Sequence, residues 1–176
     1  MIKNVNLTST GGSRMKNALG ISLGICAAVY TYLALGVISI IGAAAIWGGF
    51  IAWGSYFTVG KDALTKNISA NVFGAVLAGV AVLLYGQINA FVGAEISWAI
   101  AVGITVWALT IIPSLGNIPA NVFGYAATFG FMLLNNGGDM DVMAIAVSNP
   151  VVTMSIAMVV GSIFGLISEK VAAQLG

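Results

Sequence analysis

Charged residues are absent from two long stretches of this chain. Between Lys16 and Lys61 no Asp, Glu, Lys or Arg occurs. Between Lys66 and Asp139 the single charged residue is Glu95. Charged residues make up 6% of the chain and apolar residues 60%, whereas a soluble domain carries about 25% charged residues. So little polar surface cannot cover a fold in water, and we therefore predict a protein embedded in a lipid bilayer.

The two stretches are long enough for several membrane-spanning helices. A hydrocarbon layer of about 30 Å needs about 20 helical residues. The predicted spans cover residues 18–36, 38–57, 70–90, 95–112, 119–136 and 150–168. These segments lack the alternation of apolar and polar residues that is typical of a transmembrane β-barrel. The sequence therefore predicts an all-α polytopic membrane protein with six transmembrane helices.

The distribution of charge predicts the orientation. All six basic residues fall on one side of a six-span arrangement, namely Lys3, Arg14, Lys16, Lys61, Lys66 and Lys170. Glu95, Asp139 and Asp141 fall on the other side. The positive-inside rule then places both termini in the cytoplasm. We expect a cytoplasmic segment at 1–16, one six-helix domain at 17–168 and a cytoplasmic tail at 169–176. Residues 19–37 are long for a cleaved signal peptide, so we expect a retained first helix.

An eight-residue segment occurs twice, 50 positions apart. Residues 67–74 read Asn-Ile-Ser-Ala-Asn-Val-Phe-Gly and residues 117–124 read Asn-Ile-Pro-Ala-Asn-Val-Phe-Gly, so seven of eight positions match. Both copies would begin a helix from the same side of the membrane, which indicates a parallel repeat. Asn17 and Gly24 fall in the same register and suggest a third copy. We interpret the pattern as three tandem helical hairpins, and internal repeats are common in transporters.

The residue types of this repeat fit the start of a helix. Asn67 and Asn117 are expected to cap the first turn. Asn71 and Asn121 lie one turn deeper, where an amide must face a cavity or another helix. The glycine that ends each copy permits a close helix contact. Capping and packing alone would account for all of these features, and a solute-binding role is the alternative interpretation.

Polar residues recur along the fifth predicted span and on its neighbours. Asn121, Thr128 and Asn135 are spaced by seven, and Tyr125 shares their face. The sixth span adds Ser155 and Ser162, and the fourth adds Trp98 and Thr105. Uncharged amides and hydroxyls can replace the hydration of a neutral solute without trapping an ion. The expected substrate pathway comprises Asn71, Asn121, Tyr125, Thr128, Asn135, Trp53 and Trp98. Hydrogen bonding between helices is the competing explanation for the same residues.

The sequence offers few groups for catalysis. It contains no His, which excludes imidazole metal sites, Ser-His-Asp triads and His proton relays within this chain. Cys26 is the single cysteine and fits a small packing residue. Glu95 fits the first turn of the fourth span; if it were buried, it would instead be a proton or cation site. We therefore expect no enzyme activity, no cofactor and no metal.

Three segments resemble a known family. They are residues 46–57, 118–129 and 161–165, and the likeness extends over residues 17–168. The family comprises small bacterial inner-membrane proteins and is catalogued as domain of unknown function ten-ninety-seven. The resemblance implies a multi-pass protein of the bacterial inner membrane and assigns no substrate. Where members often have Pro-Gly-Thr, this chain has Pro119-Ala120-Asn121, so the resemblance implies no role for Asn121.

Two function classes remain open. The first is a channel or facilitative transporter for a small neutral polar solute, of the urea or short amide type. The alternative is a non-transporting membrane assembly or regulatory subunit. The expected partners are membrane lipid and the neutral solute, with no nucleic acid. Glycines at 161 and 165, like those at 48, 49 and 54, suit close helix contacts, and we expect a homo-oligomer.

Overall fold

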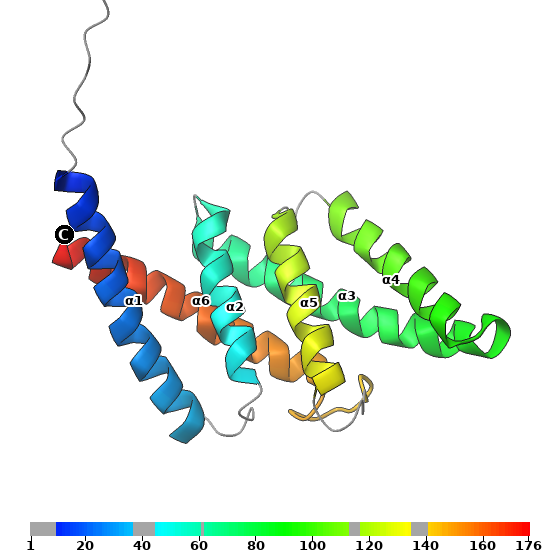
Figure 1. The fold of residues 1–176 in the computed structure, drawn as a ribbon. Coiled ribbons are helices and arrows are strands. Elements are labelled where there is room, and N and C mark those ends of the chain that lie inside the picture. Colours follow the sequence, from blue (N-terminus) through cyan, green and yellow to red (C-terminus); the bar gives the residue numbers. More distant parts are fainter. Residues whose placement is uncertain (1–9, 37–44, 61, 113–116, 135–140) are drawn as a thin grey trace, which may run out of the picture.

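The computed structural model describes residues 10–36, 45–60, 62–112, 117–134 and 141–176. Within these ranges the chain forms six α-helices (Figure 1). The helices are α1 (Thr10–Gly36), α2 (Ala45–Val59), α3 (Ala63–Val92), α4 (Ala94–Ile111), α5 (Ile118–Leu134) and α6 (Pro150–Leu175). Each predicted span overlaps one helix, so the all-α class is confirmed. Several helices are longer than predicted, most clearly α1 and α3.

The lengths and surfaces of the helices agree with a membrane environment. Four helices, α1, α3, α4 and α6, contain a segment long and apolar enough to cross a membrane. The other two are shorter, with 15 residues in α2 and 17 in α5. Large apolar side chains point outward, as Ile21, Ile25 and Val29 do on α1. Outward apolar side chains are what lipid contact requires, and a multi-pass membrane protein is the class that this chain fits.

Tight turns connect several of the helices. The turn between α2 and α3 contains Gly60 and Asp62, both with positive φ. Gly93, with a φ of 81°, lies between α3 and α4 and reverses the chain direction. At the start of α6, the Asn149 side chain accepts a hydrogen bond from the backbone N–H of Val151 at 2.9 Å. This N-cap is followed by Pro150, whose missing N–H is not needed in the first turn.

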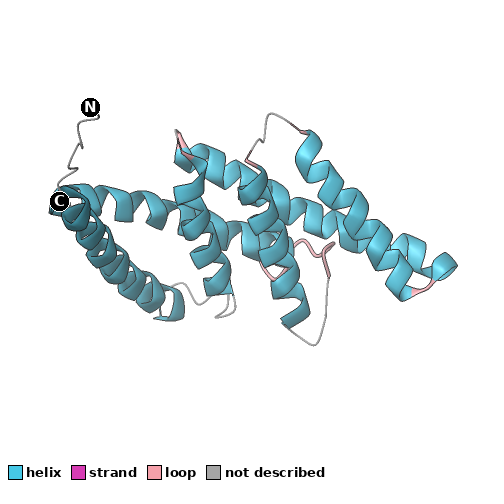
Figure 2. Ribbon diagram, turned by 45° about the horizontal axis from the view of Figure 1, so that its top comes forward, coloured by secondary structure: helices cyan, strands magenta, loops and turns pink. Residues whose placement is uncertain are grey.

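The six helices form two halves with the same arrangement, one made of α1, α2 and α6 and the other of α4, α5 and α3. Helix α2 packs extensively on α6, and α5 packs extensively on α3. Helix α1 packs on α6 as α4 packs on α3. The halves meet where α2 contacts α5 and where α3 contacts α6. Figure 1 shows that α1 and α4 run in opposite directions, as do α2 and α5, so an approximate two-fold axis along the view relates the halves. The beginning of α1 and the end of α6 lie side by side (Figure 2).

The halves correspond residue by residue. The buried positions of α1 match those of α4 after a shift of 75, pairing Ser22, Cys26, Tyr30 and Ala34 with Ser97, Ala101, Thr105 and Leu109. The same shift pairs Ala45, Gly49 and Ala52 of α2 with Ala120, Gly124 and Ala127 of α5. A shift of 87 pairs Ala70, Val72 and Gly74 of α3 with Ala157, Val159 and Gly161 of α6. Equivalent positions therefore share their burial, and several of them hold the same small residue.

Side-chain contacts follow the same correspondence. In the first half the ring of Tyr30 packs edge-on against Phe50 with centroids 5.0 Å apart. In the second half the equivalent pair is Thr105 and Tyr125, whose hydroxyls lie 2.8 Å apart. The two halves are therefore two antiparallel copies of one three-helix arrangement.

Glycines mark the two closest helix crossings. A Cβ at Gly74 would overlap the carbonyl oxygen of Asn121, and a Cβ at Gly124 would overlap that of Asn71. Where α2 crosses α6, a Cβ at Gly161 would overlap the carbonyl oxygen of Gly49. Contacts this close exclude any side chain on the glycine. These contacts lie within one chain, as does the contact of Gly165 with the Tyr56 side chain of α2, so the predicted close helix contacts at Gly49, Gly161 and Gly165 are confirmed.

The eight-residue repeat has a different meaning from the one predicted. Residues 67–74 and 117–124 lie on α3 and α5, which cross each other at Gly74 and Gly124. They are the two sides of one reciprocal contact, and their similarity reflects the shared need for close approach. The repeating unit of the fold is three helices in antiparallel copies, in place of the predicted tandem hairpins. Along the sequence the two copies are α1–α3 and α4–α6. Because each copy has an odd number of helices, the second copy runs in the opposite direction.

Candidate functional site

A cluster of uncharged polar side chains is buried where α3 contacts α2 and α6. The amide cluster consists of Ser55, Asn67, Asn71 and Ser162, all with at most 1% of their surface exposed. The Asn67 Nδ2 donates to the Ala52 carbonyl and to the Ser162 hydroxyl, at 2.8 Å in both cases. The Ser55 hydroxyl donates to the Asn67 Oδ1. The amide cluster thus joins three helices through side-chain hydrogen bonds.

Asn71 completes the cluster from one turn further along α3. Its Nδ2 lies 2.9 Å from the Ser55 Oγ and 2.9 Å from the Asn67 backbone carbonyl oxygen. These contacts hold the Asn71 amide against α2. Buried amides of this kind are stable only when their polar atoms have partners, so the amide cluster fixes the side chains of α3 relative to α2 and α6.

The two asparagines that were expected to cap helices differ in the structure. Asn117 precedes α5, and its Oδ1 accepts from the Ala120 backbone N–H at 3.0 Å, which confirms the predicted cap. Asn67 lies inside α3, which begins at Ala63, and its side chain bonds to α2 and α6. The predicted capping role of Asn67 is therefore wrong. The helix begins earlier than the apolar pattern indicated, so position 67 falls one turn inside it.

The predicted polar stripe of α5 faces the protein interior. Asn121 and Thr128 are fully buried and Tyr125 nearly so. The Asn121 Nδ2 donates to the Leu109 carbonyl of α4 at 3.0 Å, and Tyr125 meets Thr105 of α4. The Thr128 hydroxyl donates to the Gly124 carbonyl on its own helix at 2.8 Å. Asn135, the fourth member, lies outside the described residues. These three side chains are satisfied mainly by α4 and by α5 itself.

Two buried atoms lack a partner. Among the described residues, the buried side-chain oxygens without a hydrogen bond are the Oδ1 atoms of Asn71 and Asn121. These residues are equivalent members of the eight-residue repeat and lie at the crossing of α3 and α5. A buried acceptor without a partner destabilises a fold by about 1–3 kcal/mol. The same pair was singled out from the sequence, and the structure brings both residues to one crossing.

The predicted tryptophans take part in aromatic packing. The Trp53 indole stacks on Phe50 and donates to the Ser168 hydroxyl at 2.9 Å. Trp98 stacks on Tyr85 with ring centroids 4.0 Å apart. Trp53 belongs to the contact of α2 with α6, and Trp98 to that of α4 with α3. Each tryptophan is therefore a packing residue within one half of the molecule.

Glu95 lies in the first turn of α4 and its side chain is exposed. A carboxylate at this position interacts favourably with the helix dipole. The condition set for a proton or cation site, burial of the carboxylate, is not met. Among the described residues no group of His, Cys, Asp or Glu side chains could hold a metal ion. The buried polar interior of the described helices is thus formed by amides and hydroxyls.

An apolar groove runs between α2 and α5 where the two halves meet. Its volume is about 580 Å³, and Met154 of α6 closes part of it. The lining includes residues from equivalent positions of the halves, such as Ile51 and Ala126. Ser55 also lines the groove and hydrogen-bonds Asn71 behind it. The groove therefore touches the amide cluster at one side chain.

Sequence reasoning missed two members of this arrangement. Ser55 lies between aromatic residues of α2 and was not among the predicted pathway residues. Asn67 was noticed but was assigned to a helix cap. The four-residue spacing of Asn67 from Asn71 could have identified Asn67, since residues four apart on a helix share a face. Ser55 lies on α2, and no local spacing connects it to Asn71.

Comparison with known proteins identifies one family. The family model described as Protein of unknown function (DUF1097) matches residues 20–173. No curated protein and no solved structure matches the chain.

Proposed function

The chain belongs to the DUF1097 family, and from its geometry we propose that it moves a small neutral polar solute across the bacterial inner membrane. The proposed protein has six transmembrane helices and both termini in the cytoplasm. It acts as a facilitative transporter or channel. Urea and short amides are the solutes of the proposed class.

The observation that carries this proposal is the antiparallel pair of three-helix halves. Inverted repeats of this kind are typical of transporters, in which the substrate site lies at the interface between the repeats near the middle of the membrane. Here the α2–α5 and α3–α6 contacts form that interface. The amide cluster and the groove lie beside it. The arrangement provides two equivalent halves that can open in turn on either side.

The chemistry of the interior favours a neutral solute. Amides and hydroxyls can replace the hydrogen bonds that a solute makes with water. An ion would need a compensating charge or several coordinating dipoles. The buried polar residues of the described helices are Ser, Thr and Asn, which suits an uncharged molecule.

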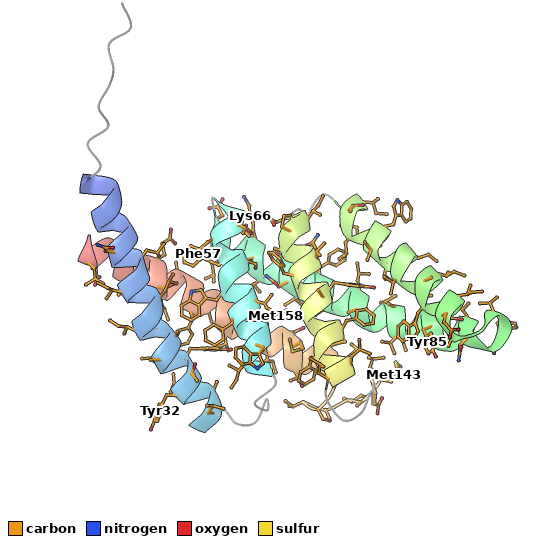
Figure 3. The ribbon with its side chains drawn as sticks, viewed as in Figure 1. Tyr32, Phe57, Lys66, Tyr85, Met143 and Met158 are labelled. Carbon is orange, nitrogen blue, oxygen red and sulfur yellow. The ribbon has the colours of Figure 1, made fainter. Side chains whose placement is uncertain are left out.

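The proposed orientation rests on the basic residues. Lys66 lies in the first turns of α3, on the side where α1 begins (Figure 3). Lys170 lies near the end of α6, which packs beside the beginning of α1. A cysteine at Lys66 should be protected from an impermeant thiol reagent applied to intact cells. A cysteine at Asp141, before α6, should react from outside. The reverse labelling pattern would contradict the orientation.

Flux measurements test the function. Purified protein in proteoliposomes should carry urea or formamide faster than empty vesicles do. Asn121→Leu should lower the flux because it removes a buried amide next to the α3–α5 crossing. Asn89→Leu, on an exposed position of α3, serves as the control and should leave the flux unchanged. Equal flux in protein-containing and empty vesicles for several neutral solutes would refute the proposal.

The second candidate is a non-transporting membrane assembly or regulatory subunit. It is favoured by the internal hydrogen bonds of Tyr125 and Thr128, which need no solute. A homo-oligomer fits either candidate. The particle size in mild detergent checks this point, and a monomer under every condition would exclude it.

A further inference from the structure

The two unpartnered oxygens are both acceptors. The Oδ1 atoms of Asn71 and Asn121 are fully buried and make no hydrogen bond. Buried side-chain donors without a partner are not found among the described residues. A ligand that satisfies this interior must therefore donate hydrogen bonds.

The orientation of each amide is determined by its surroundings. The Asn71 Nδ2 faces the carbonyl oxygen of Asn67 at 2.9 Å, and the Asn121 Nδ2 faces that of Leu109 at 3.0 Å. A backbone carbonyl can only accept a hydrogen bond. Turning either amide over would place two acceptors together, so in both residues the oxygen is the atom that remains available.

Both acceptors belong to one place in the fold. Asn71 and Asn121 flank the crossing where the backbones of α3 and α5 are in direct contact through Gly74 and Gly124. Ser55 connects this place to the groove, because it lines the groove and contacts the Asn71 amide. Ser55 is thus the groove-lining side chain that contacts Asn71.

The equivalent half shows that packing does not require amides here. The positions on α6 that correspond to Asn67 and Asn71 hold Met154 and Met158, which are also buried. The fold therefore accommodates apolar side chains at this place, and the hydrogen bonds of the Asn71 Nδ2 leave its Oδ1 without a structural partner.

We infer that the Asn71 and Asn121 side-chain oxygens form a recognition site for the N–H groups of a small neutral solute, the class represented by urea and unsubstituted amides. This inference rests on the proposed function and adds the atoms that recognise the solute. The site accepts hydrogen bonds from the solute's nitrogen. It therefore discriminates by the number of N–H groups, and a fully N-alkylated solute of similar polarity is rejected.

Binding of methylurea and tetramethylurea distinguishes these cases. Methylurea keeps three N–H groups and has a methyl signal, whereas tetramethylurea has no N–H group. Saturation-transfer NMR on the full chain in lipid nanodiscs should show methylurea bound and displaced by urea. The dissociation constant of tetramethylurea should be at least about tenfold higher, the change expected from losing one good hydrogen bond. Equal binding of the two solutes, or no binding of methylurea, would overturn the inference.

Variants locate the site. Asn71→Leu and Asn121→Leu keep the number and branching of side-chain heavy atoms and remove the amide, and each should raise the dissociation constant of methylurea about tenfold. Asn89→Leu, exposed on α3, should not change it. Unchanged binding in folded Asn71→Leu would refute the role of Asn71. If that variant does not fold, the solute comparison on the wild-type chain still decides the question.

Binding and flux can fail separately. Methylurea that binds at Asn71 without any flux would support the recognition site and refute transport. Flux of urea and tetramethylurea at equal rates would support transport and refute the recognition site. Oxygens that are satisfied by ordered water alone would give no solute binding, which also overturns the inference.

Discussion

Helix α3 carries the buried Asn67 and Asn71 in its first turns, whereas α6 carries Met154 and Met158 at the equivalent positions. Both pairs are almost completely buried. The asparagines bond to α2 and α6. The methionines pack in a core of alanines from α2, α3, α5 and α6, and Met158 lies in the centre of the molecule (Figure 3).

The two halves therefore have the same arrangement of helices but different side chains at these buried positions. The two halves share their helix order, their close glycine crossings and the burial pattern of their outer helices. They do not share the amide cluster. Because the methionine half reaches the same arrangement by apolar packing, the layout does not depend on polar groups at this place. The amides of α3 are therefore the residues to test for function.

The largest expected effect on stability comes from the close glycine crossings, which both halves have. Gly74→Leu and Gly161→Leu should both prevent a stable fold, because each new Cβ would overlap a backbone carbonyl oxygen that cannot move aside. The loss should reach or exceed the about 1–3 kcal/mol typical of overpacking. Yield and monodispersity in detergent provide the measurement.

Gly86→Ala is the matched control, since Gly86 lies in α3 with no atom near the added Cβ. It should stabilise the helix by about 0.5–1 kcal/mol. If Gly74→Leu and Gly86→Ala behaved alike, the close crossing of α3 and α5 would be contradicted.

The second largest effect on stability should differ between Asn67 of α3 and the equivalent Met154 of α6. Asn67→Leu removes four side-chain hydrogen bonds, three within the amide cluster and one to the Ala52 carbonyl, and leaves the buried Asn71 and Ser162 side chains with fewer partners. We expect a loss of about 2–3 kcal/mol in the free energy of unfolding. Met154→Leu nearly conserves volume and should cost less than about 1.5 kcal/mol.

Thermal unfolding of both variants in the same detergent measures this difference. A larger loss for Met154→Leu than for Asn67→Leu would mean that apolar packing at α6, rather than the amide cluster, dominates the centre of the molecule.

A smaller effect follows from placing an amide in the apolar half. Met158→Asn introduces a polar side chain among alanines and methionines and should cost about 1–3 kcal/mol, depending on whether it finds a partner. Met158→Leu is the control for volume. Wild-type stability of Met158→Asn would show that this half can satisfy an amide as well, and the contrast between the halves would lose its meaning.

The smallest expected effect concerns the contact of Tyr125 with Thr105, which is equivalent to the contact of Phe50 with Tyr30 in the other half. Tyr125→Phe removes the hydrogen bond to Thr105 and makes the position identical to Phe50 of the other half. Hydrogen bonds between membrane helices contribute about 0.6 kcal/mol on average, and we expect a loss of this size. Tyr32→Phe, on the exposed side of α1, should have no effect. A double-mutant cycle with Thr105→Val measures the coupling and would contradict the contact if it were zero.

Much of the candidate site could be recognised from the sequence, but its connections could not. Asn71, Asn121, Tyr125 and Thr128 were expected to face the interior, and all four are buried. Thr128 bonds within α5, but the other three have partners on α2 and α4, at sequence separations that no local pattern indicates. The repeat at 67–74 and 117–124 was equally visible, yet its similarity comes from a contact between the copies. A local match in sequence does not reveal whether two segments are equivalent or face each other.

The sequence by itself determined the class of protein and its number of helices. Charge-free stretches of sufficient length can form stable structure in lipid only as helices that satisfy their own backbone, and Gly, Asn and Pro positions limit where those helices begin and end. Tertiary structure alone decided that the chain forms two antiparallel halves. Few equivalent positions of the two halves hold identical residues, and most of those residues are small. The reason is that helix packing limits side-chain volume at each crossing, whereas neighbouring positions can hold polar or apolar side chains.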